Sequence, residues 1–426
     1  MPFLTDPSAF HVDIARARSF TDLCQVLPPL LERYKHLLPA DPRAKILLKP
    51  NLNANMNALT GNTTDLRLLS AVIRVLQDRG YTDITIGEGT NSGFYRNKIG
   101  VISRLMVDKL AAYHGVAVTD LNYAEPSPVP FADGVTAHVA RECVEAELFI
   151  NLPVLKTHFE AGMTVCLKNM MGCLIGQENK KKTHQSLAAN ILNLNRAVSP
   201  HLHVVDALVA MEGLGPTRGT PVRLDTILVG EDPLLLDLTC ARLAKFDHRQ
   251  VTTLRLAEAQ GLLTPAHHAY VKSLDLQGLE RPFAPPKAGF LATFIHSPKR
   301  QKYFLAVRNT RLFTWLASTQ WFGNLLFCTG LRQDVFLKDE MRLDGLDLDR
   351  SRCDDCGVCR DFCPVGSDPR VVLEKKGQAW ETDCIKCLYC YMICPKQAIV
   401  FRGEMGFLGE QMRQYEEIVR GMGGKA

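Results

Sequence analysis

Two short stretches, CDDCGVCRDFCP at residues 353–364 and CIKCLYCYMICP at residues 384–395, decide the fold of the C-terminal part of the chain. Each contains three cysteines separated by two residues, a fourth cysteine after three more residues, and then a proline. Two-residue gaps let three thiolates of one loop reach three corners of an iron–sulfur cubane, while the fourth ligates the other cluster. The doubled pattern therefore predicts two 4Fe–4S clusters.

The proline after each fourth cysteine favours an exchange of ligands between the two runs. Pro364 and Pro395 restrict the preceding cysteine to an extended conformation, which turns it away from its own run. Structural zinc sites are the alternative, but zinc ribbons use separated cysteine pairs rather than runs of three. Residues 345–403 resemble bacterial two-cluster ferredoxins. We assign one cluster to Cys353, Cys356, Cys359 and Cys394, and the other to Cys384, Cys387, Cys390 and Cys363.

The composition of the 426 residues is that of a globular protein of two or three domains, with 46% hydrophobic and 22% charged residues. The net charge of +5 is modest, and its basic residues are spread along the chain, so we predict no nucleic-acid binding. The basic runs at residues 180–182 and 299–302 are interpreted as solvated surface. Cysteines at metal-ligand spacing, and an N-terminus without an apolar signal segment, favour a cytoplasmic location.

Upstream of the cysteine runs, apolar segments of strand length alternate with helical patterns. KILLKPNL at 45–52, ITIGEG at 84–89, ELFINLPV at 147–154, HLHVVDALV at 201–209 and DTILVG at 225–230 are typical of strands. Residues 65–79 and 234–246 have the spacing of helices. We therefore predict an α/β domain with a mostly parallel sheet covered by helices, followed by a small α+β cluster domain.

Polar residues repeatedly follow the predicted strands, where functional residues of parallel sheets gather. Among them and in the segment beyond, we select Lys156, His158, Lys168 and His184 as candidate catalytic residues, with Asn169 beside them. Such a group could bind a carboxylate or phosphate, coordinate a metal, or supply a proton during reduction. The alternative is that Lys168 and Asn169 belong to one helix face and that His184 is a loop residue. The other polar residues at strand exits are Lys49, Asn51, Asn53, Glu88, Thr157 and Glu212.

The same segments carry a resemblance to a known family. LLKPNLN, IGEGT, INLPVLKTHFEAGMTVCLKNMMGCLIG, VVDALVAMEGLGPTRGTP and GEDPLLLDLTCARL together resemble the domain-of-unknown-function family 362 over residues 44–250. In many members this domain is joined to a two-cluster ferredoxin module. The resemblance implies an iron–sulfur protein that is presumed to be redox active, and it implies no substrate.

An aromatic and basic segment separates the two predicted domains. Residues 312–331 contain no charged residue, but their polar residues argue against a transmembrane helix. Three structural roles are therefore possible for this segment: a buried lid, a pocket wall for an apolar substrate, or a membrane-interface or docking patch over residues 299–331. We divide the chain into an α/β domain at 1–284, this insertion or lid at 285–344, the cluster domain at 345–403 and a C-terminal helical tail at 404–426.

These observations favour an iron–sulfur oxidoreductase that passes electrons through two 4Fe–4S clusters to a substrate held by the α/β domain. An external ferredoxin or flavoprotein would donate the electrons, and the basic candidate residues suit an anionic small molecule. The alternative is an electron-transfer or assembly subunit that docks to a partner enzyme and has no substrate of its own. A protein that handles a metal or cofactor, with sensory or structural clusters, is a third class.

Overall fold

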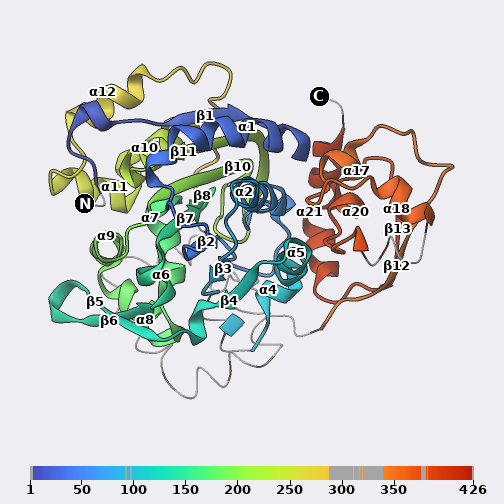
Figure 1. Ribbon diagram of the computed structural model, residues 1–426, viewed down its shortest axis with the longest axis horizontal. Coiled ribbons are helices and arrows are strands. Elements are labelled where there is room, and N and C mark those ends of the chain that lie inside the picture. The colour runs from blue at the N-terminus through green and yellow to red at the C-terminus, as the bar shows by residue number, and fades with distance from the viewer. Residues whose placement is uncertain are drawn as a thin grey trace.

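A computed structural model describes residues 3–424 apart from 92–93, 96–97, 287–309, 311–315, 317–318, 320–338, 376–379 and 381. A large α/β part and a small C-terminal part lie side by side (Figure 1). The predicted fold class is confirmed, because the large part contains a mostly parallel sheet with helices on both faces and the small part combines strands and helices.

The sheet of the large part is mixed, with a parallel centre. Its strand order is β1-β11-β10-β7-β2-β3-β4, in which β10, β7, β2, β3 and β4 run parallel, β11 pairs antiparallel with β10, and β1 pairs antiparallel with β11. After Pro153 the chain continues from β7 into β8, which pairs with β10 and with β9. The bounds are β1 Asp13–Arg16, β2 Ile46–Pro50, β3 Ile84–Glu88, β4 Ala117–Asp120, β7 Leu148–Leu152, β8 Val154–His158, β9 Gly162–Thr164, β10 Leu202–Glu212 and β11 Thr220–Gly230.

Both faces of the sheet are covered, so every residue of the central strands β2 and β7 is buried. Side chains alternate between faces along a strand, so Ile46 and Leu48 pack in one core and Leu47 packs in another. The first face carries α1 (Phe20–Arg33), α2 (Leu66–Asp78), α4 (Val101–Arg104) and α5 (Val107–His114). The rest of the α/β part contains α6 (Glu142–Glu145), α7 (Cys166–Asn169), α8 (Gly176–Thr183), α9 (Leu187–Ala197), α10 (Pro233–Leu243), α11 (Thr252–Ala259), α12 (Pro265–Ser273) and the hairpin of β5 (Pro126–Pro130) and β6 (Thr136–Ala140).

The small part is built on two antiparallel strands with the cysteine runs between them. Its elements are β12 (Arg342–Leu348), α17 (Val358–Asp361), α18 (Pro369–Lys375), α20 (Tyr389–Ile393), β13 (Ile399–Glu404) and α21 (Leu408–Gly423). Strand β12 begins shortly before the expected boundary at residue 345. The predicted tail is a helix that packs on α20 and on β11, so it contacts both parts of the chain.

The predicted insertion lies almost wholly outside the described residues. Of the segment 299–331, the structure describes Thr310, Leu316 and Thr319 alone, so the lid, pocket-wall and interface hypotheses stay predictions. Among the described residues, no helix has the length and apolar character needed to cross a membrane.

Candidate redox and substrate site

Four cysteines from both runs line one hollow of the C-terminal part. This hollow is lined by Cys384, Cys387 and Cys390 together with Cys363 from the other run. Leu346, Val372 and Leu373 are among the apolar residues of its wall. Four thiols around one apolar hollow are the donor set that a 4Fe–4S cluster requires, so the residues present fit that group.

Cys394 lies with the first run, as an exchange of fourth ligands requires. Burial raises the pKa of Cys356 and that of Cys359, and the charge of Cys394 adds to both shifts because the three sulfur atoms are close. In the first group Cys356 is exposed, Cys353 is partly buried, and Cys359 and Cys394 are buried, whereas all four cysteines of the second group are partly buried. The first group therefore reaches solvent at Cys356.

The second group lies against the α/β part. Asn57, in the loop after β2, donates its Nδ2 hydrogen to the carbonyl oxygen of Cys387 at 3.3 Å. The backbone N–H of Leu66, at the start of α2, donates to the hydroxyl of Tyr389 at 3.1 Å. The loop that carries Cys387 is thus joined to the carboxyl-end loop of a central strand.

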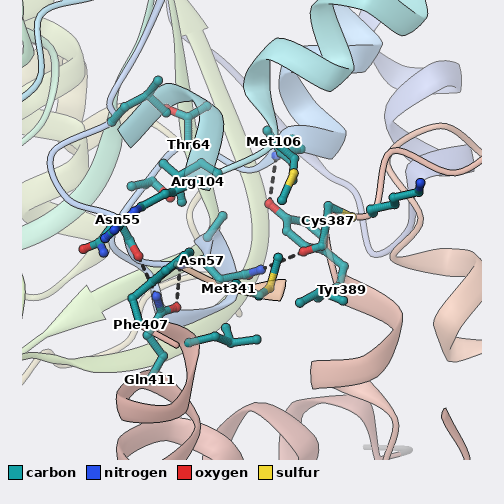
Figure 2. A pocket seen from close by; sticks show the side chains of 18 residues that line it. Asn55, Asn57, Thr64, Arg104, Met106, Met341, Cys387, Tyr389, Phe407 and Gln411 are labelled. Carbon is teal, nitrogen blue, oxygen red and sulfur yellow. Dashed lines mark hydrogen bonds between the residues drawn. The ribbon is translucent and has the colours of Figure 1, made fainter. Parts of the chain in front are cut away.

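A pocket lies at this junction (Figure 2). The α/β part contributes Asn55, Asn57, Thr64, Arg104 and Met106 to its lining, and the C-terminal part contributes Met341, Cys387, Tyr389, Phe407 and Gln411. Arg104 is held by an ion pair with Glu340 at 2.6 Å, and its guanidinium lies 4.6 Å from the ring centre of Phe407. The pocket brings a cysteine of the second run together with polar side chains of the α/β part.

Behind the pocket, the strand exits hold a buried network of lysines. Lys49 Nζ donates to Glu88 Oε2 at 2.9 Å, and Lys156 Nζ donates to Asn51 Oδ1 at 2.9 Å and to the carbonyl of Asn62 at 2.6 Å. Lys49 and Lys156 are both 0% exposed. Burial raises the pKa of Glu88, and the nearby Lys49 opposes this shift. These lysines therefore satisfy buried oxygens of the protein.

Lys180 belongs to the same buried region. Its Nζ donates to the carbonyls of Gly89 and Thr90 and to Asn122 Oδ1, at 2.9, 2.7 and 2.6 Å. Burial lowers its pKa to about 8. The interpretation of residues 180–182 as solvated surface is therefore wrong for Lys180, because its ammonium group is fully hydrogen-bonded inside the fold.

A second charged group surrounds Glu160, just after β8. His158 Nδ1 accepts the N–H of Glu160 at 3.0 Å, and His184 Nδ1 lies 3.4 Å from the Glu160 carboxylate. Burial lowers the pKa of Lys168 to about 8, and the charge of Glu160 opposes this effect. Burial also lowers the pKa of His158, and the charge of Lys168 adds to that effect. Lys168 and His184 are partly exposed, whereas His158 lies buried beneath them.

Comparison with known families identifies both parts. Residues 46–242 match the domain of unknown function DUF362, and residues 346–395 match the 4Fe-4S dicluster domain. The chain is a DUF362 domain fused to a 4Fe-4S dicluster domain. The resemblance seen in the sequence is thereby confirmed, and the cysteine-rich motif at 353–394 belongs to a cluster-binding domain.

Individual relatives of this DUF362 fusion are distant. A thylakoid-associated protein of Synechocystis sp. is 24% identical over 274 residues, which cover 59% of this chain and 79% of the relative. Two solved structures share 12% identity: the lactate racemase apoprotein from Thermoanaerobacterium thermosaccharolyticum, with a TM-score of 0.34, and a protein from Thermotoga maritima, with a TM-score of 0.30. The matches cover 57% and 50% of this chain, but only 60% and 56% of those two chains.

Within the DUF362 domain, the predicted residues fall into two places. His158, Lys168 and His184 meet around Glu160, whereas Lys156 points into the buried network of Asn51 and Asn62. Glu160 was not among the predicted residues, although its position between the candidates His158 and Lys168 was a usable signal. Sequence analysis also missed the pocket, because most of its lining residues lack a catalytic pattern and come from distant parts of the chain.

Proposed function

We propose that this chain is an iron–sulfur oxidoreductase in which the dicluster domain delivers electrons to a substrate held by the DUF362 domain. One observation supports this most directly: the loop of Cys387 is hydrogen-bonded to Asn57, and a pocket lies at that contact. Two bound 4Fe–4S clusters supply one-electron transfer over such a contact. The partly buried second run is thereby placed next to the DUF362 domain.

The exposed loop around Cys356 in the first run suits an external electron donor such as a ferredoxin or flavoprotein. Cys356 is exposed, as are the flanking Asp354 and Asp355. If Cys363 and Cys394 each ligate the cluster of the other run, the distance and orientation between the two clusters would be fixed. The chain thus offers one cysteine run to a partner protein and the other to its own α/β domain.

The group around Glu160 suits an anionic small molecule. Lys168 is partly exposed, and an ammonium group binds carboxylate or phosphate oxygens through charge-assisted hydrogen bonds. His184, which is also partly exposed, lies 3.4 Å from the Glu160 carboxylate and offers a second polar group beside Lys168. The buried His158 would position this group through the backbone N–H of Glu160, whereas Lys156 would act separately, by holding Asn51.

Reoxidation of the reduced protein tests this function. Anaerobically purified protein is reduced with dithionite, desalted, and mixed with a protein-free metabolite extract of the source cells while the visible absorption is followed. We expect the extract to reoxidise the wild type much faster than buffer does. A double variant, Lys168→Gln with His184→Gln, is expected to lose this reaction and to keep reoxidation by ferricyanide.

The alternative, a docking subunit without its own substrate, predicts a different result. In that case wild type and double variant would respond equally to the extract, and only a partner protein would reoxidise them. An Arg249→Gln variant serves as the control, because it changes an exposed charge on η8 (His248–Gln250). Loss of ferricyanide reactivity in the double variant would indicate damage to the cluster domain instead.

We further propose a cytoplasmic location with peripheral attachment to a membrane. The thylakoid-associated relative supports attachment, and so do the aromatic and basic residues of the segment 299–331. Cell fractionation checks this proposal. A protein attached in this way is expected in the membrane fraction and should be released by high salt or carbonate.

A further inference from the structure

Three potential metal ligands meet on the α/β domain at a distance from the cysteine runs. His248 lies on η8, Glu258 on α11 and His268 on α12. One ligand atom of each lies within 4.8 Å of the others. Figure 1 places α11 and α12 at the end of the molecule opposite the dicluster domain. This group therefore has no part in the candidate redox site.

The geometry of the three side chains is that of ligands around one ion. His268 Nε2 lies 3.3 Å from Glu258 Oε1, and His248 Nε2 lies 3.6 Å from Glu258 Oε2. A tetrahedral zinc ion with bonds of about 2.0 to 2.1 Å separates its ligand atoms by roughly 3.3 Å. The two imidazole rings converge on the same carboxylate, with ring centres 4.8 Å apart.

The ring nitrogens give a second, independent indication. Nε2 of His248 and Nε2 of His268 are both shielded from solvent and have no hydrogen-bond partner in the part of the chain that the structure describes. A shielded polar atom without a partner is costly. Ordinary histidine–glutamate ion pairs would place an N–H on the carboxylate oxygen, and neither contact meets that geometry. A cation between the three groups would satisfy both nitrogens at once.

The surroundings suit a metal-binding histidine. The Asp247 carboxylate lies 3.9 Å from Nδ1 of His248, the ring nitrogen that does not face Glu258. Carboxylates near the second ring nitrogen orient metal-bound histidines and raise their basicity. Imidazole with carboxylate is a ligand set that zinc accepts, and three protein ligands leave one position for water.

We propose that His248, Glu258 and His268 bind one zinc-type divalent cation that fastens α12 to α11. Each ligand comes from a different helical segment, and the loop at residues 260–264 connects α11 to α12. Bound metal therefore restrains the packing of these helices on the sheet domain. The site lies apart from the clusters, so its occupancy is expected to change stability rather than reoxidation.

Zinc titration of the cluster-loaded protein tests the site. Anaerobically purified protein that retains its iron is titrated with zinc sulfate by calorimetry, and the zinc that remains after gel filtration is measured with the iron. We expect the wild type to hold one zinc per chain in addition to its full iron content, and to melt at a higher temperature with zinc. The double variant His248→Ala with His268→Ala is expected to bind zinc more than about 100-fold more weakly, a loss larger than that from removing an outer hydrogen-bonding partner.

Two further variants separate ligand loss from misfolding. Glu258→Gln keeps the side-chain shape but removes the charge of a partly solvent-facing ligand, so it should fold normally and still lose zinc. His36→Ala removes an exposed histidine that is paired with Glu231 outside the site, and it should bind zinc like the wild type. Equal zinc binding by the wild type and Glu258→Gln, or a wild type that retains no zinc, would overturn the proposal.

Discussion

Cys363 shows how the placement of one side chain determines the organisation of a cofactor site. Along the chain it belongs to the first run, yet it lines the hollow of Cys384, Cys387 and Cys390. Pro364 accounts for this placement, because it restricts Cys363 to an extended conformation that leaves its own loop. A single cysteine thereby links the two runs.

Replacing this cysteine tests the exchange of ligands. We expect Cys363→Ser to lower the iron content from about eight to about four per chain, since one of two cubanes loses a ligand. The paramagnetic spectrum of the reduced variant should match that of Cys384→Ser. Cys24→Ser, a partly buried cysteine on α1, is the control and should keep all its iron. A spectrum that matches Cys353→Ser instead would show that the fourth ligands do not cross.

Lys168 gives the proposed substrate site a defined dependence on pH. Burial lowers its pKa to about 8, so the ammonium group is charged below that pH and loses its charge above it. Reoxidation by the metabolite extract should therefore fall by up to about tenfold per pH unit above pH 8. The Lys168→Arg variant should keep its reoxidation rate above pH 8, because arginine stays protonated. Identical pH profiles of wild type and variant would exclude a role for this charge.

Asp237 predicts a pH dependence of stability. Burial raises its pKa from 3.8 to about 7, and its Oδ1 accepts the N–H of Cys166 at 2.8 Å. The folded state holds the proton more tightly than the unfolded state, so the free energy of unfolding falls as pH rises from about 4 to about 7. Asp237→Asn should flatten this slope in urea denaturation. The exposed Asp83→Asn should leave it unchanged, and an unchanged slope in Asp237→Asn would contradict the prediction.

Helix α21 joins the two domains. The sequence predicted this segment as a helical tail and did not indicate that it contacts both domains. Gln411 donates to the carbonyl of Asn55 at 2.5 Å and accepts the N–H of Asn57 at 2.9 Å. Further along, Tyr415 donates to the carbonyl of Thr217, and Arg420 donates to the carbonyl of Cys394. The helix therefore holds the loop after β2 and the second cysteine run in one arrangement.

Loss of one side chain of α21 should weaken this junction. Gln411→Ala removes two hydrogen bonds and leaves two buried backbone groups without partners, which is expected to cost about 2 kcal/mol in the free energy of unfolding. Arg413→Ala, on the exposed side of the same helix, should change it by less than about 1 kcal/mol. Chemical denaturation of both variants measures the difference. Equal effects would show that α21 is an independent tail.

The whole molecule brings a cluster-binding domain and a DUF362 domain into direct contact. We expect anaerobically reconstituted protein to contain about eight irons and eight sulfides per chain, because the doubled motif specifies two cubanes. Elemental analysis and the paramagnetic signal of the reduced protein check this number. A preparation with stoichiometric zinc in the cysteine runs, no iron and no reducible signal would contradict it.

The sequence alone revealed features that depend on local spacing. The strand at 45–52 corresponds to β2, the helix at 65–79 to α2 and the strand at 84–89 to β3, because apolar periodicity follows from which face a segment buries. The cysteine spacing indicated the cluster domain for the same reason, since a loop of fixed length brings its thiols together.

The tertiary structure alone decided which distant residues meet. Glu160 joins His158 and His184, Lys180 is buried rather than exposed, and Cys387 lies against Asn57. None of these contacts follows from periodicity, because they arise when loops from separate strands pack at one edge of the sheet. A charge run such as 180–182 has the same composition whether it is solvated or buried, and only the packing of α8 against the loop after β3 places the Lys180 ammonium group among buried carbonyl oxygens.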